Sequence, residues 1–331
     1  MSVSRQPPST AAPPLAIIIP AYKTKFFREA LASVAAQTDK NFQLYVFDDC
    51  SPEPVGEMVR EFTACLPVQF HRFEENLGRI SLVRQWERCV RLTGEPWVWI
   101  FGDDDVMEAG CVADFYAELQ RTQQVHDLYR FNTVWIDGAG MRLSESPRHP
   151  AKEGGVDFLL ARLAAERNVT LQEIIFKRSA WESAGGIPDF PLGWHADEAF
   201  TASLGVREPL CAIPGARVNW RSSDWNISGT GSFKVINQKI IASTLFFQWV
   251  VNFFHTHAPA QTVEANRISE AWLMNYLRTC WKFLGWRACL ALDRLGRKSW
   301  HHPPGWGFFT GLQMNAKLLA HKIKRNAGSR K

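Results

Sequence analysis

The sequence lacks the cysteine patterns that mark disulfide frameworks and zinc sites. Its 331 residues include seven Cys, at positions 50, 65, 89, 111, 211, 280 and 289, and no two of them form a C-x-x-C pair. An odd number of unclustered cysteines favours buried structural thiols in a reducing compartment. The chain is therefore unlike a secreted, disulfide-stapled protein.

Long apolar runs are also lacking. No window holds about 18 uninterrupted apolar residues, the length that a membrane-spanning helix needs. Residues 1–14, MSVSRQPPSTAAPP, have no apolar core of the kind found in signal peptides. We therefore expect a disordered lead over 1–14 and a cytoplasmic protein. The formal charge of +5 is modest and does not argue for a nucleic-acid partner.

Tryptophan, by contrast, is abundant. The chain has 14 Trp, a large amphipathic residue that suits sugar faces, protein interfaces and membrane–water boundaries. The apolar share of 46% and the charged share of 21% are ordinary for a globular protein. The length favours one large domain with a smaller appendage, or two domains.

The N-terminal part alternates between apolar runs typical of strands and amphipathic patterns typical of helices. Strands are predicted at 15–20, 42–47, 68–73 and 97–101, with helices at 26–37, 55–66 and 81–92. This alternation predicts an α/β fold with a mainly parallel sheet covered by helices on both faces. Ligands of such sheets bind beyond the carboxyl ends of the strands.

Polar residues follow three of these predicted strands and are expected to converge on one crevice. They are Pro20-Ala21-Tyr22, Asp48-Asp49, and the acidic run Asp103-Asp104-Asp105. Three adjacent carboxylates repel one another, and such clusters persist where a cation compensates them. Oxygen ligands suit Mg²⁺ or Mn²⁺. The alternative is a solvated acidic turn; likewise, Asp49 could bind a base or ribose, or could form an Asx turn or helix cap.

Beyond residue 127 the pattern is less regular. Strands are predicted at 128–136 and 171–176, and helices at 156–166 and 198–204, whereas the pattern from residue 233 onward is helical. We expect one domain over 15–232, made of halves 15–127 and 128–232, followed by a C-terminal helical region over 233–331.

Three segments in this order and spacing resemble glycosyltransferase family 2, which has the GT-A fold. They are LAIIIPAYKTKFFREALASVAAQ from Leu15, FQLYVFDDCSPEP from Phe42, and NLGRISLVRQWERCVRLTGEPWVWIFGDDD from Asn76. The resemblance runs from Leu15 to Leu119 and, in weaker form, to Gly229. It implies a Rossmann-like, nucleotide-diphospho-sugar transferase fold and the transfer of a hexosyl or related group from a nucleoside-diphosphate sugar.

The resemblance also implies roles for particular residues. Pro20, Ala21 and Tyr22 would line the base pocket, and Asp49 would bind the nucleobase. The aspartates after the fourth strand would hold Mg²⁺ or Mn²⁺ on the donor diphosphate. Many relatives show Asp-x-Asp-Asp, whose first position is Gly102 here. Asp104 is therefore the best metal ligand, with Asp103 or Asp105 assisting, and Asp103 also counts among the donor-binding residues.

An inverting transfer also needs a base to take the proton of the attacking hydroxyl. The stretch from Gly185-Gly186 to Asp197-Glu198 resembles the Gly-Gly segment of the family and the acid that follows it. Asp197 is the predicted base and Glu198 the alternate, although either acid could instead cap the helix that begins there. His195, near the same helix start, could bind acceptor or diphosphate but is more typical of a structural residue.

Three arginines are candidates for contact with the donor diphosphate. Arg221 could use its bidentate fork, or could form a surface ion pair. Arg79 and Arg84 are weaker candidates. The Gln-x-x-Arg-Trp motif of processive relatives is missing, which favours transfer of a single sugar.

The basic, aromatic C-terminal region permits two interpretations. Trp281, Trp286 and nearby Lys and Arg residues could lie on an anionic membrane, on the inner face of the cytoplasmic membrane, which would suit a lipid-linked glycan acceptor. Alternatively, these helices pack on the catalytic domain with their charges in water.

The resemblance favours an inverting, non-processive enzyme. The Gly102–Asp105 run also resembles that of bacterial enzymes, including abequosyltransferase-like members, that build surface polysaccharide or lipopolysaccharide O-antigen. One alternative is a nucleotidyltransferase that makes the sugar nucleotide, but residues 20–25 lack the expected glycine. Another is an inactive sugar-nucleotide-binding module. A dehydrogenase is disfavoured because no G-x-G-x-x-G follows the first strand.

Overall fold

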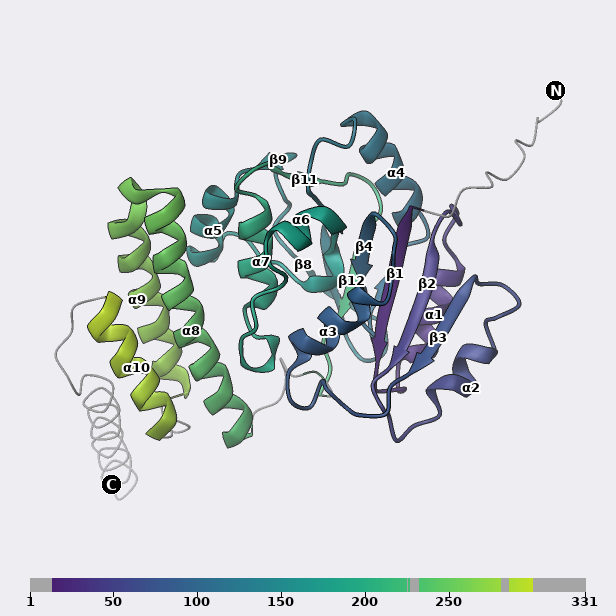
Figure 1. The fold of residues 1–331 in the computed structure, drawn as a ribbon, viewed down its shortest axis with the longest axis horizontal. Coiled ribbons are helices and arrows are strands. Elements are labelled where there is room, and N and C mark those ends of the chain that lie inside the picture. The colour runs from purple at the N-terminus through teal and green to yellow at the C-terminus, as the bar shows by residue number, and fades with distance from the viewer. Residues whose placement is uncertain (1–13, 225, 227–231, 281–285, 300–331) are drawn as a thin grey trace, which may run out of the picture.

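The computed structural model describes residues 14–224, 226, 232–280 and 286–299. Apart from Pro14, the predicted disordered lead lies outside these residues. The predicted alternation of strands and helices in the N-terminal part is confirmed (Figure 1). The strands are β1 (Leu15–Ala21), β2 (Gln43–Asp48), β3 (Val68–Arg72) and β4 (Trp97–Ile100), and the helices are α1 (Phe27–Ala35), α2 (Val55–Arg60) and α3 (Leu82–Arg91). Helix α2 ends earlier than predicted, because turns occupy residues 61–65.

These strands form the parallel half of a mixed sheet. The order is β3-β2-β1-β4-β10-β6-β11-β9, in which β3 to β4 run parallel and β10 (Ile174–Lys177) pairs antiparallel with both β4 and β6. The remaining strands are β6 (Leu128–Arg130), β9 (Lys152–Glu153) and β11 (Leu210–Ala212). The predicted mainly parallel α/β sheet is thus confirmed, with an antiparallel strand beside β4.

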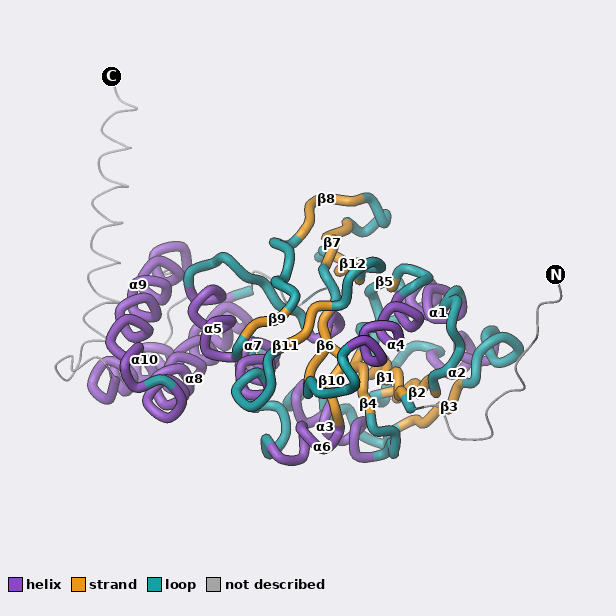
Figure 2. Tube along the Cα trace, turned by 90° about the horizontal axis from the view of Figure 1, so that it is seen from above, coloured by secondary structure: helices purple, strands orange, loops and turns teal. Residues whose placement is uncertain are grey.

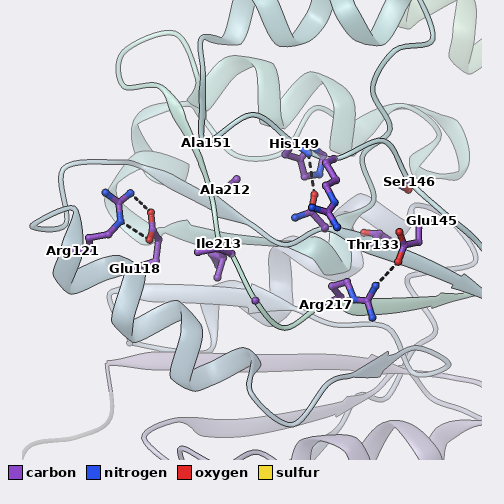
Figure 3. A pocket seen from close by; sticks show the side chains of 14 residues that line it. Glu118, Arg121, Thr133, Glu145, Ser146, His149, Ala151, Ala212, Ile213 and Arg217 are labelled. Atoms are coloured by element: carbon purple, nitrogen blue, oxygen red, sulfur yellow. Dashed lines mark hydrogen bonds and ion pairs between the residues drawn. The ribbon is translucent and has the colours of Figure 1, made fainter.

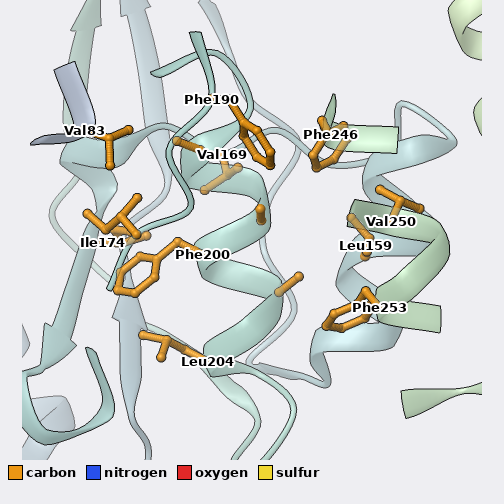
Figure 4. Packing of buried hydrophobic residues seen from close by; sticks show 14 of the residues in the cluster. Val83, Leu159, Val169, Ile174, Phe190, Phe200, Leu204, Phe246, Val250 and Phe253 are labelled. Carbon is orange, nitrogen blue, oxygen red and sulfur yellow. The ribbon is translucent and has the colours of Figure 1, made fainter. Parts of the chain in front are cut away.

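Helices cover both faces of this sheet, as the sequence pattern predicts. Side chains alternate along β1, so Ile17 packs with α1, α2 and α4 (Cys111–Arg121) in one apolar cluster. Ile18 packs in the other cluster, with α3, α5 (Gly155–Leu163), α6 (Arg178–Ser183) and α7 (Ala196–Leu204). Figure 4 shows part of this second cluster, where Phe200 of α7 lies beside Ile174.

A smaller sheet packs beside the main one, because its residues Met107 and Val218 belong to the apolar cluster that contains Ile17. Its strand order is β5-β12-β7-β8, with β5 (Val106–Met107), β7 (Thr133–Ile136), β8 (Arg142–Glu145) and β12 (Val218–Arg221). Figure 2 shows β8 projecting from the body of the molecule. The small sheet places Trp220 and Arg221 beside the acidic run that follows β4.

Two of the predicted strands are wrong in detail. The predicted strand 128–136 is two strands, β6 and β7, in different sheets. The chain changes sheets at Phe131, whose N–H bonds to the Glu173 carbonyl, and Thr133 then pairs with Val218. The predicted strand 171–176 begins as a short 3-10 helix, η1 (Leu171–Glu173), and only then becomes β10. Apolar residues alone do not reveal either change of direction.

Among the described residues, the predicted C-terminal helical region contains α8 (Phe233–His257), α9 (Thr262–Cys280) and α10 (Trp286–Ser299). They lie together on the side of α5 and α7 that is away from β1 (Figure 1). Ser232 caps α8 by accepting the N–H of Val235 at 3.3 Å. Within the described residues, no helix is long and apolar enough to cross a membrane.

Candidate functional site

A cavity of about 460 Å³ lies where β1, β2 and β4 end. We call it the aspartate cavity, and it brings together most of the predicted donor-binding and metal-binding residues. Its lining includes Pro20, Tyr22, Lys23, Asp49, Asn76, Gly78, Arg79, Leu82, Trp86, Asp103, Asp104, Asp105, Gln172 and Trp220. The sequence argument that strand ends converge on one crevice is therefore confirmed in geometry.

Asp49 fixes the loop that forms one wall of the aspartate cavity. Its two carboxylate oxygens accept the N–H groups of Leu77 and Gly78, each at 2.9 Å, and Arg88 donates to the same carboxylate. A side chain at Gly78 would clash with it, since a Cβ there would lie 2.6 Å from Asp49 Oδ2. Ala21 is buried and lies outside the lining, but its carbonyl accepts the Asp49 N–H.

The acidic run after β4 is tied to its neighbours by the two outer aspartates. Asp103 Oδ2 accepts the N–H groups of Tyr22 at 2.9 Å and Lys23 at 3.0 Å, and Asp105 Oδ1 accepts the Arg221 N–H at 2.9 Å. Burial, followed by the charge of Asp103, raises the pKa of Asp104 to about 6. Burial and the charge of Asp104 likewise raise the pKa of Asp105. The fold thus holds three acids where their charges repel, which favours a compensating cation.

The donor set fits a magnesium or manganese ion only if substrate supplies further ligands. Within the described residues, no group of three or more His, Cys, Asp or Glu side chains is placed to hold a metal. Mg²⁺ commonly binds through one or two carboxylates together with substrate phosphates. Asp104 lines the cavity between two anchored acids and suits this arrangement, in which a diphosphate would complete the coordination.

Arg221 contacts the acidic run through its backbone and its guanidinium. It is fully buried, its Nε donates to the Asp104 carbonyl at 2.8 Å, and its NH2 group pairs with Glu29 at 2.6 Å. The guanidinium also lies 4.4 Å from the centre of the Phe26 ring. The structure therefore does not bring Arg221 to the lining of the aspartate cavity, where a diphosphate contact would need it.

Of the two weaker arginine candidates, Arg79 lines the aspartate cavity and Arg84 does not. Arg79 is exposed and lines the aspartate cavity. Arg84 lies one helical turn into α3, pairs with Asp189 at 3.3 Å, and is outside the cavity lining. Only Arg79 is thus placed for the predicted donor contact.

A second cavity, of about 570 Å³, adjoins the first. The two share Leu82, Trp86, Leu171, Gln172 and Trp220, so ligands in both would meet at this boundary. Five tryptophans line the second cavity, which we call the tryptophan cavity: Trp86, Trp135, Trp194, Trp220 and Trp272. Asp197 and Glu198 also line it, so the predicted base faces a space next to the acidic run.

The two acids at the start of α7 have opposite electrostatic environments. Glu198 accepts hydrogen bonds from Arg162 at 2.7 Å and pairs with His195 Nδ1 at 3.0 Å. Burial alone would raise the pKa of Glu198, but His195 and Arg162 outweigh it and lower the pKa to about 2. Burial, followed by the charge of Glu198, raises the pKa of Asp197 to about 8. The raised pKa makes ionised Asp197 a stronger proton acceptor than an ordinary carboxylate, whereas Glu198 is a fixed charge.

Asp197 lies in the first turn of α7, where its Oδ1 accepts the N–H of the next residue, Glu198, at 2.9 Å. His195 lines the tryptophan cavity and also makes several structural contacts. It is buried, adopts a left-handed backbone with φ 70°, and stacks on Phe246 with ring centres 4.5 Å apart. Its Nε2 lies 2.9 Å from Ser243 Oγ, which connects α8 of the C-terminal region to the acid pair.

Sequence reasoning missed several residues of both cavities. Lys23, Asn76 and Gly78 lie in the segments that carried the resemblance, so their positions offered a signal. Trp86 lies one turn beyond Leu82 on α3, and this pair marks a shared helix face. Trp272 and Gln172 offered no such signal, because only the tertiary fold brings α9 and η1 to this site.

A third cavity, of about 570 Å³, lies apart and shares no lining residue with the other two (Figure 3). Its lining includes several charged residues, and ion pairs form between Arg121 and Glu118 and between Arg217 and Glu145. His149 pairs with Glu173 at 3.0 Å behind this surface. None of the predicted site residues lies there.

Comparison with known proteins supports the assignment of the fold and of the enzyme class. Residues 16–153 match the sequence model of the family described as "Glycosyl transferase family 2". No curated protein sequence is significantly similar to the chain.

Similar solved structures include TarS of S. aureus. Residues 1–349 of TarS in complex with UDP-GlcNAc share 13% identity with this chain over 91% of it and 88% of that chain, with a TM-score of 0.57. The complex with UDP gives 14% identity, the same coverage and a TM-score of 0.54. A longer TarS structure gives 15% identity and a TM-score of 0.53, and this chain covers 52% of its length. At these identities the likeness is one of fold.

Residues 16–153 therefore contain a glycosyl transferase family 2 domain, and the described chain has the predicted GT-A-like fold with a C-terminal helical region. The predicted enzyme class, a glycosyltransferase, is confirmed.

Proposed function

We propose that the protein is an inverting, non-processive glycosyltransferase that moves one sugar from a nucleoside-diphosphate sugar to a hydroxyl of a glycan or lipid-linked glycan. The observation that carries this proposal is the junction of the two cavities. The aspartate cavity holds the acidic run, the tryptophan cavity holds Asp197, and Gln172 and Trp220 line both. The anomeric carbon would lie at this boundary.

The aspartate cavity is proposed as the donor site. Asp49 shapes the wall that would receive the base, together with Pro20 and Tyr22, while Lys23 and Arg79 supply positive charge for the diphosphate. Asp104, assisted by Asp103 or Asp105, would hold Mg²⁺ or Mn²⁺, and a divalent ion in this place offsets the charge that grows on the departing diphosphate. In TarS the bound donor is UDP-GlcNAc, which supports a nucleotide sugar here but leaves the base open.

The tryptophan cavity is proposed as the acceptor site. An acceptor hydroxyl attacks the anomeric carbon, the bond from that carbon to the diphosphate oxygen breaks, and the hydroxyl proton moves to Asp197. Attack from the face opposite the leaving group inverts the anomeric configuration. The raised pKa of Asp197 supports its role as base, and the ion pairs of Glu198 leave it as the less suitable alternate.

The finer predictions rest on the resemblance stated above. The Gly102–Asp105 run supports a role in bacterial surface polysaccharide or lipopolysaccharide O-antigen synthesis, of the abequosyltransferase-like type. The division into 15–127, 128–232 and 233–331 follows the element pattern. Peripheral contact with the inner face of the cytoplasmic membrane would use α10, where Arg294 and Arg297 are described. Trp281 lies outside the described residues, and the side chain of Trp286 is likewise not described.

A thermal-shift panel tests the donor site. UDP-, GDP-, CDP- and TDP-sugars are added with and without Mn²⁺ to wild type, Asp104→Ala and the control Glu57→Ala. Glu57 is exposed on α2, away from both cavities. A ligand that binds only the folded state raises its apparent stability. We expect one nucleotide class to stabilise wild type and Glu57→Ala in a metal-dependent way, with this effect lost in Asp104→Ala. Lack of any response in folded wild type would refute the proposal.

A further inference from the structure

The tryptophan cavity is richer in tryptophan than the rest of the described molecule. Nine tryptophan side chains are described, and five of them line this one cavity. All five are partly exposed, whereas Trp97, Trp99 and Trp181 are buried in the core. Trp86, Trp194 and Trp272 also pack against the apolar core, but all five side chains remain partly exposed and line the cavity.

These tryptophans come from elements that are far apart in sequence. Trp135 of β7 and Trp220 of β12 are register partners in the small sheet, with ring centres 4.5 Å apart and planes tilted by 59°. Trp272 comes from α9, where its ring lies 5.4 Å from Phe247 and 5.7 Å from His195. Trp194 is covered by Lys239, 4.5 Å from its ring centre. The C-terminal helices thus contribute one aromatic surface and the small sheet another.

Polar groups lie between these aromatic surfaces. The lining includes Asn168, Thr170, Gln172, Ser222 and Ser223. Gln172 is 7% exposed, and among the described residues its Nε2 has no hydrogen-bond partner. A lipid chain would leave this buried donor unsatisfied, at a cost in free energy. A sugar ring presents C–H groups on its faces and hydroxyls at its edge, and therefore matches both kinds of surface.

The charges of this cavity argue against an anionic occupant. Among the described lining residues, the ionisable groups are Arg162, His195, Asp197 and Glu198. The Arg162 guanidinium and the His195 ring are both paired with Glu198. A phosphate or carboxylate would therefore meet Asp197 without an unpaired cation to compensate it. The aspartate cavity differs in that its lining includes two cationic side chains, Lys23 and Arg79.

We infer that the tryptophan cavity binds an uncharged sugar ring of the acceptor glycan, and that Trp272 of the C-terminal region is one of the platforms that hold it. This inference rests on the proposed function. The sugar faces pack on Trp272 and on the Trp135–Trp220 pair, and the Gln172 amide donates to a ring substituent. In this position a hydroxyl at the ring edge meets Asp197. The C-terminal helices are thereby part of the acceptor site.

Saturation-transfer NMR on the full chain, with UDP and Mn²⁺ present, tests this assignment. The neutral probes are maltotriose, cellotriose and mannotriose; the anionic probes are trigalacturonate and a glycerol phosphate trimer; the lipid probe is decyl phosphate. We expect at least one neutral trisaccharide to bind with the highest affinity. Trp272→Ala should weaken it by about tenfold, which corresponds to the loss of one aromatic contact. Trp272→Phe should bind within about threefold of wild type, since an aromatic face remains.

Trp249→Ala is the matched control, because Trp249 packs on Phe253 of the same helical region and lies outside the cavity. Near-UV circular dichroism checks that each variant is folded. If Trp272→Ala does not fold, Trp272→Phe is measured in its place. Stronger binding of the anionic or lipid probes, binding of no neutral trisaccharide, or equal losses in Trp272→Ala and Trp249→Ala would each overturn the inference. Donor binding to wild type is measured separately by thermal shift. If wild type binds no donor, the proposed function is refuted. If wild type binds the donor, a negative result with the acceptor probes refutes this inference alone.

Discussion

The aspartate cavity takes most of its residues from the ends of consecutive strands, whereas the tryptophan cavity takes its residues from segments spread between α3 and α9. In the first, backbone N–H groups hold the functional acids, as with Asp49 and Asp103. In the second, Glu198 is held by side chains of other elements, Arg162 and His195. Local geometry therefore assembles one site, and tertiary packing assembles the other.

This difference has an electrostatic counterpart. In the aspartate cavity like charges are gathered without an internal counter-ion for each, which suits a metal and a diphosphate. In the tryptophan cavity Arg162 and His195 neutralise Glu198, and this leaves Asp197 as the one acid whose pKa is strongly raised. In the aspartate cavity a bound metal and diphosphate would compensate the acidic charges, whereas in the tryptophan cavity the protein's own side chains compensate Glu198.

The largest expected effect concerns Asp197, and it separates the two cavities. Asp197→Asn keeps the shape but removes the proton acceptor, so kcat should fall by about 10²–10⁴-fold while donor affinity is unchanged. Radiolabelled sugar transfer and a donor thermal shift measure the two quantities. Glu57→Ala provides the exposed-acid control. A parallel loss of donor affinity would show that the cavities are not independent.

The same variant should be more stable than wild type at neutral pH. Burial raises the pKa of Asp197 to about 8, so the folded protein retains a proton that the unfolded chain releases above about pH 4. Stability is therefore lost as pH rises from the unfolded value to the folded one. Asparagine removes this cost, and thermal unfolding at pH 7 should show a gain of about 0.5–2 kcal/mol. Equal or lower stability would contradict the raised pKa.

The contrast between the cavities also explains how far the sequence could predict this molecule. β1, β2 and β4 are short, mainly apolar runs followed by polar residues, so their type and the position of Asp104 could be inferred locally. Arg221 could not be placed, because its burial against Glu29 and Phe26 depends on β12 reaching α1. Trp272 lies on a helix whose partners are distant in sequence. The chain's change of sheets at Phe131 has the same cause, since long-range pairing overrides a continuous apolar pattern.

Gly78 offers a way to disturb the aspartate cavity alone. In Gly78→Ala the new Cβ would lie 2.6 Å from Asp49 Oδ2. The Asp49 carboxylate is fixed there, because Oδ2 accepts the Gly78 N–H and Oδ1 accepts the Leu77 N–H. Such overpacking typically costs about 1–3 kcal/mol, so donor affinity should weaken by about tenfold. Gly94→Ala is the control, because nothing lies within 4 Å of its Cβ position. Calorimetric titration of the donor measures both variants, and unchanged affinity in Gly78→Ala would argue against the donor assignment.

The acid pair predicts a pH dependence. If ionised Asp197 is the base, kcat/KM should rise with pH through its pKa of about 8. Glu198→Gln removes the second-largest cause of that shift, a like charge, and should move this limb roughly one unit toward lower pH. Wild type and Glu198→Gln are compared by measuring kcat/KM from about pH 6 to about pH 10, which covers the rising part of the profile. A limb that stays in place would assign the titration to another group.

The smallest expected effect tests whether the C-terminal helices support the acid pair. Ser243→Ala on α8 removes the partner of His195 Nε2, and one hydrogen bond is worth about 0.5–1.5 kcal/mol. We expect kcat to fall by about two- to tenfold with donor affinity unchanged, because His195 then holds Glu198 less firmly. Thr256→Ala removes a hydroxyl from the same helix whose bond stays within it, to the Asn252 carbonyl. If Ser243→Ala and Thr256→Ala lose activity equally, α8 contributes stability alone. If only Ser243→Ala loses activity, the tryptophan cavity depends on a residue far along the chain. Unchanged donor affinity would show that the aspartate cavity does not depend on it.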